Sequence, residues 1–134
     1  MSVVLYNKTV SVPCIGLLDS GNLLTMPLSG NPVHIADAAL LQKLVDEKTV
    51  QKEIPYRALG NPHGKLQVYC MDGMKVETEP AKFCDWKQVW VGCAENGVLC
   101  NKPYQLILHA SVADHCGCTK RSIPNDKKTE KGET

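Results

Sequence analysis

Glycine, proline and asparagine divide this sequence into short apolar runs, most of them only long enough for a single strand. Helical spacing is clear in one place, where alanine and leucine recur every three or four positions after Asp37, a residue able to cap a helix. This pattern predicts a helix over residues 37–47, and a weaker one predicts a helical turn over 110–114. Strands are predicted at 3–6, 10–12, 15–18, 33–35, 54–59, 65–70, 75–77, 88–91 and 105–109. The chain is therefore expected to be mainly β, with one principal helix.

Composition limits the possible partners. The 134 residues are 43% apolar and 22% charged, which suits one domain with a modest core. The formal charge is +1, from 15 basic and 14 acidic residues, so the basic field of a general nucleic-acid binder is absent. No apolar run approaches the roughly 20 residues that span a bilayer. Beyond Thr119, Ile123 is the one large apolar residue, so we predict a domain over 1–118 and a disordered tail over 119–134.

The seven cysteines are interpreted as mostly free thiols, because their number is odd and no secretory signal precedes them. A metal or redox module would depend on Cys70, Cys84, Cys93, Cys100, Cys116 and Cys118. The first four lack the spacing of zinc ligands. His115, Cys116 and Cys118 form a closely spaced trio without a second local pair, and are interpreted as surface groups. We expect neither a metal nor a cofactor.

The most informative segment is 15–24, where an aliphatic run leads directly into Asp19, Ser20 and Gly21. A carboxylate at the end of a buried strand is costly to desolvate unless its charge is used or compensated. The Ser20 hydroxyl can bond to a neighbouring loop, and Gly21 allows another backbone to approach closely. These features favour a carboxylate at the base of a symmetric interface. The alternative is a β-turn in which Asp19 accepts a hydrogen bond from Gly21 or Asn22.

Residues 17–22 resemble the active-site loop of pepsin-type and retroviral-type aspartic proteases. A wider pattern resembles the protease domain of the sporulation sigma-E factor-processing peptidase family, stage II sporulation protein GA. The matching segments are 18–22, 27–28, 32–33, 54–60, 91–92 and 104–110, so the resemblance covers most of residues 3–112. Family members commonly carry Thr at the position of Ser20, an exchange that keeps the hydroxyl. The implied fold is a retropepsin-like closed β-barrel half that is active as a twofold dimer.

The resemblance also implies an activity: an aspartic endopeptidase that removes the pro-sequence of a sporulation sigma factor in the mother cell. It assigns catalysis to Asp19, with Ser20 and Gly21 supporting the loop. Aspartic proteases need two carboxylates that share a proton, and the chain has a single Asp-Ser-Gly, so the second is expected from another copy. The implied partners are the precursor, the second copy and an activating signalling protein.

The family's membrane-spanning half precedes its protease half. The implied location is therefore the cytoplasmic side of the mother-cell membrane, with membrane contact only through an N-terminal segment that this chain lacks.

The predicted hairpin over residues 57–70 is a candidate flap above the site. Leu59, Gly60, Asn61 and Gly64 are its candidate substrate-binding residues, although an ordinary exposed hairpin has the same kind of tip.

Two other classes of function stay open. One is a non-catalytic protein-interaction module with a protease-like fold, and the other is the cysteine-based metal or redox module. His63 and His109 have no Ser or Cys partner at a recognisable spacing, so a nucleophilic triad is not expected.

Overall fold

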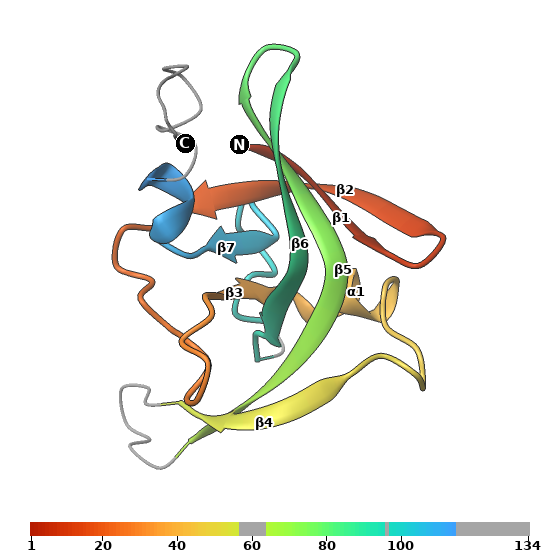
Figure 1. The fold of residues 1–134 in the computed structure, drawn as a ribbon, viewed down its shortest axis with the longest axis vertical. Helices are drawn as coiled ribbons and strands as arrows, with labels where there is room; N and C mark the ends of the chain where they lie inside the picture. The colour runs from red at the N-terminus through yellow and green to blue at the C-terminus, as the bar shows by residue number, and fades with distance from the viewer. Residues whose placement is uncertain (57–63, 96, 115–134) are drawn as a thin grey trace.

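The computed structural model describes residues 1–56, 64–95 and 97–114. Its elements are β1 (Ser2–Asn7), β2 (Val10–Leu18), β3 (Val33–Ala36), α1 (Ala38–Gln42), β4 (Gln51–Pro55), β5 (Lys65–Glu79), β6 (Lys82–Cys93) and β7 (Leu106–Leu108). Six strands close into a barrel in the order β1-β2-β7-β3-β6-β5, because β1 also pairs with β5. The remaining strand, β4, pairs with the first part of β5 (Figure 1). The predicted mainly β fold with a closed barrel is confirmed.

Three strand ends meet at one edge of the barrel. β7 lies between β2 and β3, parallel to β2 and antiparallel to β3. Leu18, the last residue of β2, is opposite Leu108, the last residue of β7. The first residues of β3 lie at this same edge because β3 runs the opposite way. Asp19 therefore emerges beside the end of β7 and the start of β3.

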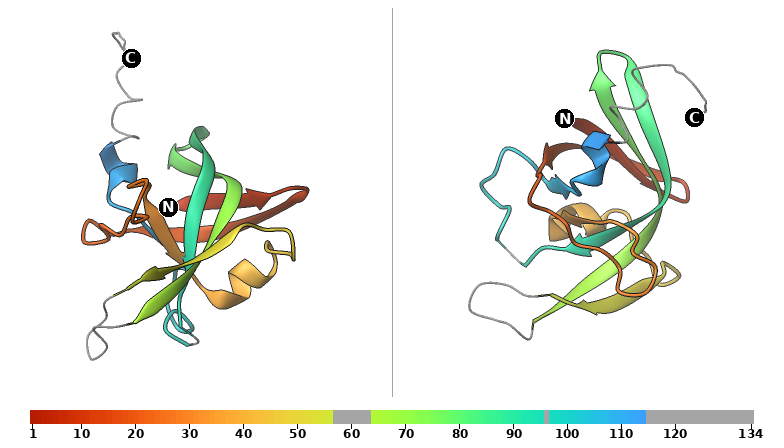
Figure 2. Two further views of the ribbon diagram at one scale, coloured as in Figure 1. Left: turned by 60° about the horizontal axis from the view of Figure 1, so that its bottom comes forward. Right: turned by 60° about the vertical axis from the view of Figure 1, so that its left-hand side comes forward.

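The core has two parts, which the long strand β5 connects. Leu66 and Val68 on β5 belong to a small cluster beneath β4, whereas Met71, Met74 and Val76 belong to the main barrel core. Buried positions alternate over short stretches of the strand, and the alternation shifts phase between residues 68 and 71 and again between residues 73 and 74. Figure 2 shows that β5 curves across the barrel and that its hairpin with β6 projects beyond it. A single strand can thus line two separate cores.

β2 differs from its prediction in two ways. The expected strands at 10–12 and 15–18 form one continuous strand, which includes Pro13. Proline is tolerated there because β7 pairs only with residues 16–18, so the missing N–H lies along an open stretch of β2. The prediction of a buried strand is also wrong, since Ile15 and Leu17 are 44% and 39% exposed. One face of β2 packs into the barrel and the other is open.

β5 contains the residues Asp72 and Gly73, which the sequence pattern indicates as a turn. They instead lie in the middle of the strand, where Gly73 is opposite Tyr6 of β1. The missing side chain at Gly73 leaves room for the Tyr6 ring. The Tyr6 hydroxyl donates a hydrogen bond to Asp85 Oδ1 (2.9 Å) and accepts one from Lys87 Nζ (2.8 Å). Local sequence patterns cannot predict this packing, because Tyr6 and Gly73 are far apart in the sequence.

Substituting Gly73→Ala is expected to lower the free energy of unfolding by about 1–3 kcal/mol, because the added Cβ overlaps the Tyr6 ring and hydroxyl. Chemical denaturation measures the change. In a Tyr6→Ala background the same substitution should cost much less, because the overlapping ring is gone. An equal cost in both backgrounds would contradict this explanation.

The principal helix is shorter than the predicted 37–47. α1 ends at Gln42, although Val45 N–H still donates to Leu41 O (2.9 Å). Just beyond the helix, the Leu44 carbonyl accepts a hydrogen bond from the buried Asn7 side chain (2.9 Å). Asp37 occupies the cap position without a side-chain cap bond. The weak prediction of a closing helical turn is confirmed at residues 111–114.

The domain boundary at 118 and the predicted tail lie outside the described residues. Within the described part of the chain, no helix has the length and apolarity needed to cross a membrane.

Candidate active site

The Asp19 loop is a compact turn at the open end of β2. Gly21 N–H donates a hydrogen bond to Asp19 Oδ1 (2.8 Å), and Asn22 N–H donates to the Asp19 carbonyl oxygen (3.0 Å). The side chain of Asp19 is half-buried. Its second oxygen, Oδ2, bonds to none of the residues that the structure describes. The turn predicted as the alternative is therefore present, and it still leaves one carboxylate oxygen for chemistry.

Asn22 anchors this loop to the barrel. Its buried side chain donates from Nδ2 to the Val33 carbonyl (3.2 Å) and accepts from Leu24 N–H at Oδ1 (3.2 Å). Its own carbonyl accepts from Ala110 N–H (2.9 Å), just beyond β7. The loop is thus tied to the start of β3 and to the chain just beyond β7, which restricts where the Asp19 carboxylate can move.

A cavity of about 440 Å³ opens beside Asp19. Its lining comes from the Asp19 loop, β3, the end of β4 and β7: Asp19, Gly21, Asn22, Leu23, Leu24, Ile35, Pro55, Tyr56 and Ile107. Among the described residues of this lining, Asp19 is the one carboxylate. The cavity therefore places a single carboxylate against a largely apolar wall.

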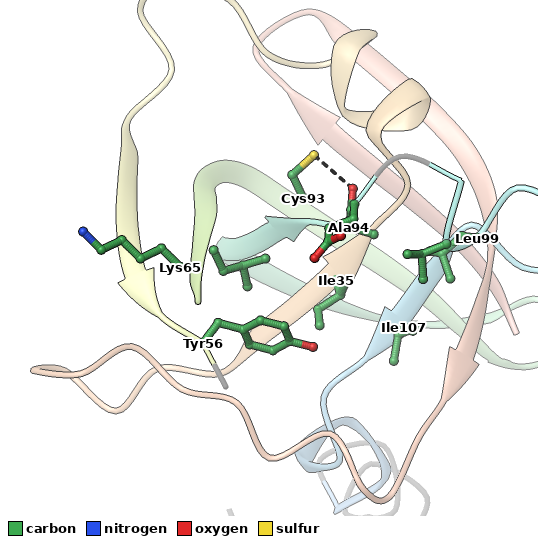
Figure 3. A pocket seen from close by; sticks show the side chains of 10 residues that line it. Ile35, Tyr56, Lys65, Cys93, Ala94, Leu99 and Ile107 are labelled. Carbon is green, nitrogen blue, oxygen red and sulfur yellow. Dashed lines mark hydrogen bonds between the residues drawn. The ribbon is translucent and has the colours of Figure 1, made fainter. Parts of the chain in front are cut away.

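A second cavity, of about 310 Å³, continues from the first, because Ile35, Tyr56 and Ile107 line both. Figure 3 shows these three side chains converging from β3, the end of β4 and β7. Leu66 and Leu99 extend the apolar wall, while Lys65 and Glu95 supply the charged groups. Together the cavities form a groove with an apolar wall, with Asp19 in the first cavity and Lys65 and Glu95 in the second.

Sequence reasoning did not assign Ile35, Tyr56 or Ile107 to the site. Tyr56 and Ile107 fall within segments that carry the family resemblance, and this was the available signal. The sequence gives no such signal for Ile35, because an apolar residue in a predicted strand cannot be distinguished from a core residue. Only the pairing of β3 with β7, which sets Ile35 opposite Ile107, brings the two to the groove.

The other predicted site residues have different outcomes. Ser20 and Gly21 are exposed beside Asp19. Of the candidate flap residues, Leu59, Gly60 and Asn61 lie outside the described residues. Gly64 is described, and its carbonyl accepts a hydrogen bond from Tyr56 N–H (2.8 Å) at the base of the β4–β5 hairpin.

His109 has a serine neighbour, contrary to the sequence expectation. Its Nδ1 lies 2.9 Å from Ser111 Oγ and also accepts the Ser111 backbone N–H (3.0 Å). Because Ser111 is only two residues away and both its groups meet the same nitrogen, the contact is a local turn. It does not supply a base for a nucleophile. His63 lies outside the described residues.

The described cysteines do not favour redox or metal chemistry. Cys14, Cys70, Cys93 and Cys100 are free thiols. Burial raises the pKa of the Cys14 thiol to about 11, and burial also raises the pKa values of Cys70 and Cys93. A raised pKa disfavours the thiolate, the reactive and metal-binding form. Cys116 and Cys118 lie outside the described residues, and the described part of the chain contains no group of three ligating side chains.

A comparison of the sequence with protein-family models gives a match to a family of peptidases. Residues 1–112 match the model of a peptidase family, Peptidase_U4, described as Sporulation factor SpoIIGA. The protein is thus a sporulation-related protease. It belongs to the SpoIIGA family. No curated protein and no solved structure gives a significant match.

Proposed function

We propose that this chain is an aspartic endopeptidase that works as a twofold dimer. Asp19 of each copy supplies one of the two carboxylates, and the substrate is the precursor of a sporulation sigma factor. The observation that carries the proposal is the lone carboxylate of the first cavity: Asp19 is the one carboxylate among the described residues that line it. Water activation in this class of protease needs two carboxylates that share a proton.

A twofold interface supplies the second carboxylate without any further residue, because it presents the same patch from both copies. Side chains two apart on a strand point to the same face, which places Ile15 and Leu17 on the face of β2 that leads to Asp19. Both are partly exposed, and Leu23 in the following loop is 70% exposed. This apolar stripe, together with the exposed Ser20, supports contact with a second copy around the Asp19 loop.

In the proposed mechanism, one Asp19 is ionised and takes a proton from a water held between the two carboxylates. The resulting hydroxide adds to the peptide carbonyl, whose oxygen receives the proton of the other Asp19. Collapse of the tetrahedral intermediate breaks the C–N bond, and the amine leaves with the proton that the first Asp19 took from the water. The second Asp19 takes a proton from one hydroxyl of the intermediate as the C=O bond forms again, so the dyad once more holds one proton. Gly21 N–H holds Oδ1 of each carboxylate, so that Oδ2 faces the water.

A mixing experiment tests the shared site. Wild-type and Asp19→Asn chains are combined in equal amounts at constant total concentration, and precursor cleavage is measured. Random pairing makes about a quarter of the dimers fully wild type, so the rate should fall to about a quarter. A site complete within one chain predicts about half instead, and that result would overturn the dimer.

A non-catalytic interaction module is the second candidate. The hydrogen bond from Gly21 N–H to Asp19 Oδ1 favours it, because this bond gives Asp19 a structural role that requires no catalysis. Under this alternative, neither the wild-type chain nor any mixture cleaves the precursor, although binding persists.

A further inference from the structure

We propose that His34 is a positioning residue for the Asp19 loop. The inference rests on the proposed function, because the role it assigns is to hold a catalytic carboxylate in place. The carrying observation is a closed circuit of hydrogen bonds at the barrel edge where β2, β3 and β7 meet. None of the motifs in the sequence points to His34.

The circuit begins at His34 on β3. His34 Nδ1 accepts a hydrogen bond from His109 N–H (2.9 Å), which fixes the chain as it leaves β7. The next residue, Ala110, donates its N–H to the Asn22 carbonyl (2.9 Å). Asn22 Nδ2 then donates to the carbonyl of Val33 (3.2 Å), the residue before His34. Each member is thereby held from two sides.

The circuit reaches Asp19 through Asn22, whose N–H donates to the Asp19 carbonyl (3.0 Å). A movement of Asn22 therefore moves the loop whose carboxylate must meet its partner. Displacing a catalytic group by roughly 1 Å can slow a reaction about 100-fold. Loss of a positioning residue should therefore lower kcat, whereas loss of a histidine that only fills the core should lower stability alone.

Two buried imidazoles lie near the Asp19 loop: that of His34 belongs to the circuit, whereas His109 joins it only through its backbone N–H. The tautomer of each follows from its donor. His34 and His109 are 3% and 8% exposed. A backbone N–H can only donate, so His34 Nδ1 must be unprotonated to accept from His109. Ser111 N–H imposes the same state on His109 Nδ1. The remaining nitrogen, His109 Nε2, is buried without a hydrogen-bond partner among the described residues.

The surroundings of His34 favour its neutral form. The cavity of about 300 Å³ that it lines also contains Lys87, Trp86, Trp90 and Ser111, and no described lining residue is acidic. His109 is a further titratable group close to it, and like Lys87 it offers no negative charge. An imidazolium here would face no counter-charge, so the acceptor at Nδ1 is preserved.

The test compares two substitutions of similar size in the full chain. His34→Leu removes the acceptor, whereas His34→Asn keeps an oxygen close to the position of Nδ1. Two readouts are needed: amide hydrogen exchange at Asn22 and Ala110, and kcat and KM for cleavage of the precursor. Val89→Ala is the matched control, because Val89 lines the same cavity and its side chain has no part in the circuit.

For His34→Leu we expect exchange at Ala110 to rise about tenfold and kcat to fall by up to about 100-fold, with little change in KM. His34→Asn should restore most of both values. Val89→Ala should leave kcat unchanged and should not raise exchange at Ala110 more than elsewhere in the barrel. If His34→Leu leaves exchange at Ala110 unchanged, or if His34→Asn is equally impaired, the proposal is overturned.

Failure of the proposed function gives a different pattern: the wild-type chain does not cleave, while the exchange differences persist. If His34→Leu does not fold, the nitrogen NMR chemical shifts of the wild-type imidazoles test the proposal instead, because they show which ring nitrogen of His34 carries the proton. His34 protonated at Nδ1 at neutral pH would overturn the positioning role.

Discussion

Replacing Asp19 with Asn is expected to reduce precursor cleavage by at least about 100-fold, because a positioned acid or base contributes about 100-fold to 10,000-fold to such reactions. The fold should be unaffected. The amide oxygen of Asn still accepts the Gly21 N–H that Asp19 Oδ1 accepts now, so the turn is retained. Cleavage assays and thermal melting of the same preparation measure both effects.

Asp114→Asn is the matched control, because Asp114 is exposed and lies outside both cavities of the groove. It should cleave at the wild-type rate. Asp19→Ala separates the turn from the chemistry: it loses the bond to Gly21 as well, at a cost of about 1 kcal/mol in stability. If Asp19→Ala cleaves the precursor, the aspartic protease proposal is wrong.

Acidification from pH 7 to about pH 4 is expected to cost the fold about 3 kcal/mol through His34 alone. Burial first, and then the neighbouring His109, lowers the pKa of His34 from 6.5 to about 4. Below pH 6.5 the unfolded chain binds a proton that the folded chain refuses, so the unfolded state gains. The stability contribution is complete above pH 6.5 and declines until pH reaches about 4. Denaturation midpoints across this range measure it.

His34→Asn provides the comparison, because Asn cannot titrate. Its free energy of unfolding should depend less on pH between 6.5 and 4 by about the same 3 kcal/mol. Asp46 contributes little to the change in stability between pH 6.5 and pH 4. A hydrogen bond from Lys8 lowers the pKa of Asp46 from 3.8 to about 2, so its contribution is lost only at lower pH. An identical pH profile for wild type and His34→Asn would contradict the assignment.

The sequence by itself determined the fold class and the location of the Asp19 loop. Both are written in local patterns: strands have a period of two, turns need particular residues, and an aliphatic run ending in Asp-Ser-Gly is contiguous. The strands at 3–6 and 33–35 are close to β1 and β3 for this reason. The family resemblance likewise needed only short contiguous segments, and it is confirmed over residues 1–112.

Only the tertiary structure decided the features that depend on residues distant in sequence. Gly73 continues a strand because Tyr6 packs over it, and the chain just beyond α1 is held by a hydrogen bond from Asn7 to the Leu44 carbonyl. The groove exists because β7 inserts between β2 and β3, and the same insertion brings His109 to His34, 75 positions away. Such contacts are selected by packing and hydrogen-bond satisfaction across the whole barrel, which no local pattern encodes.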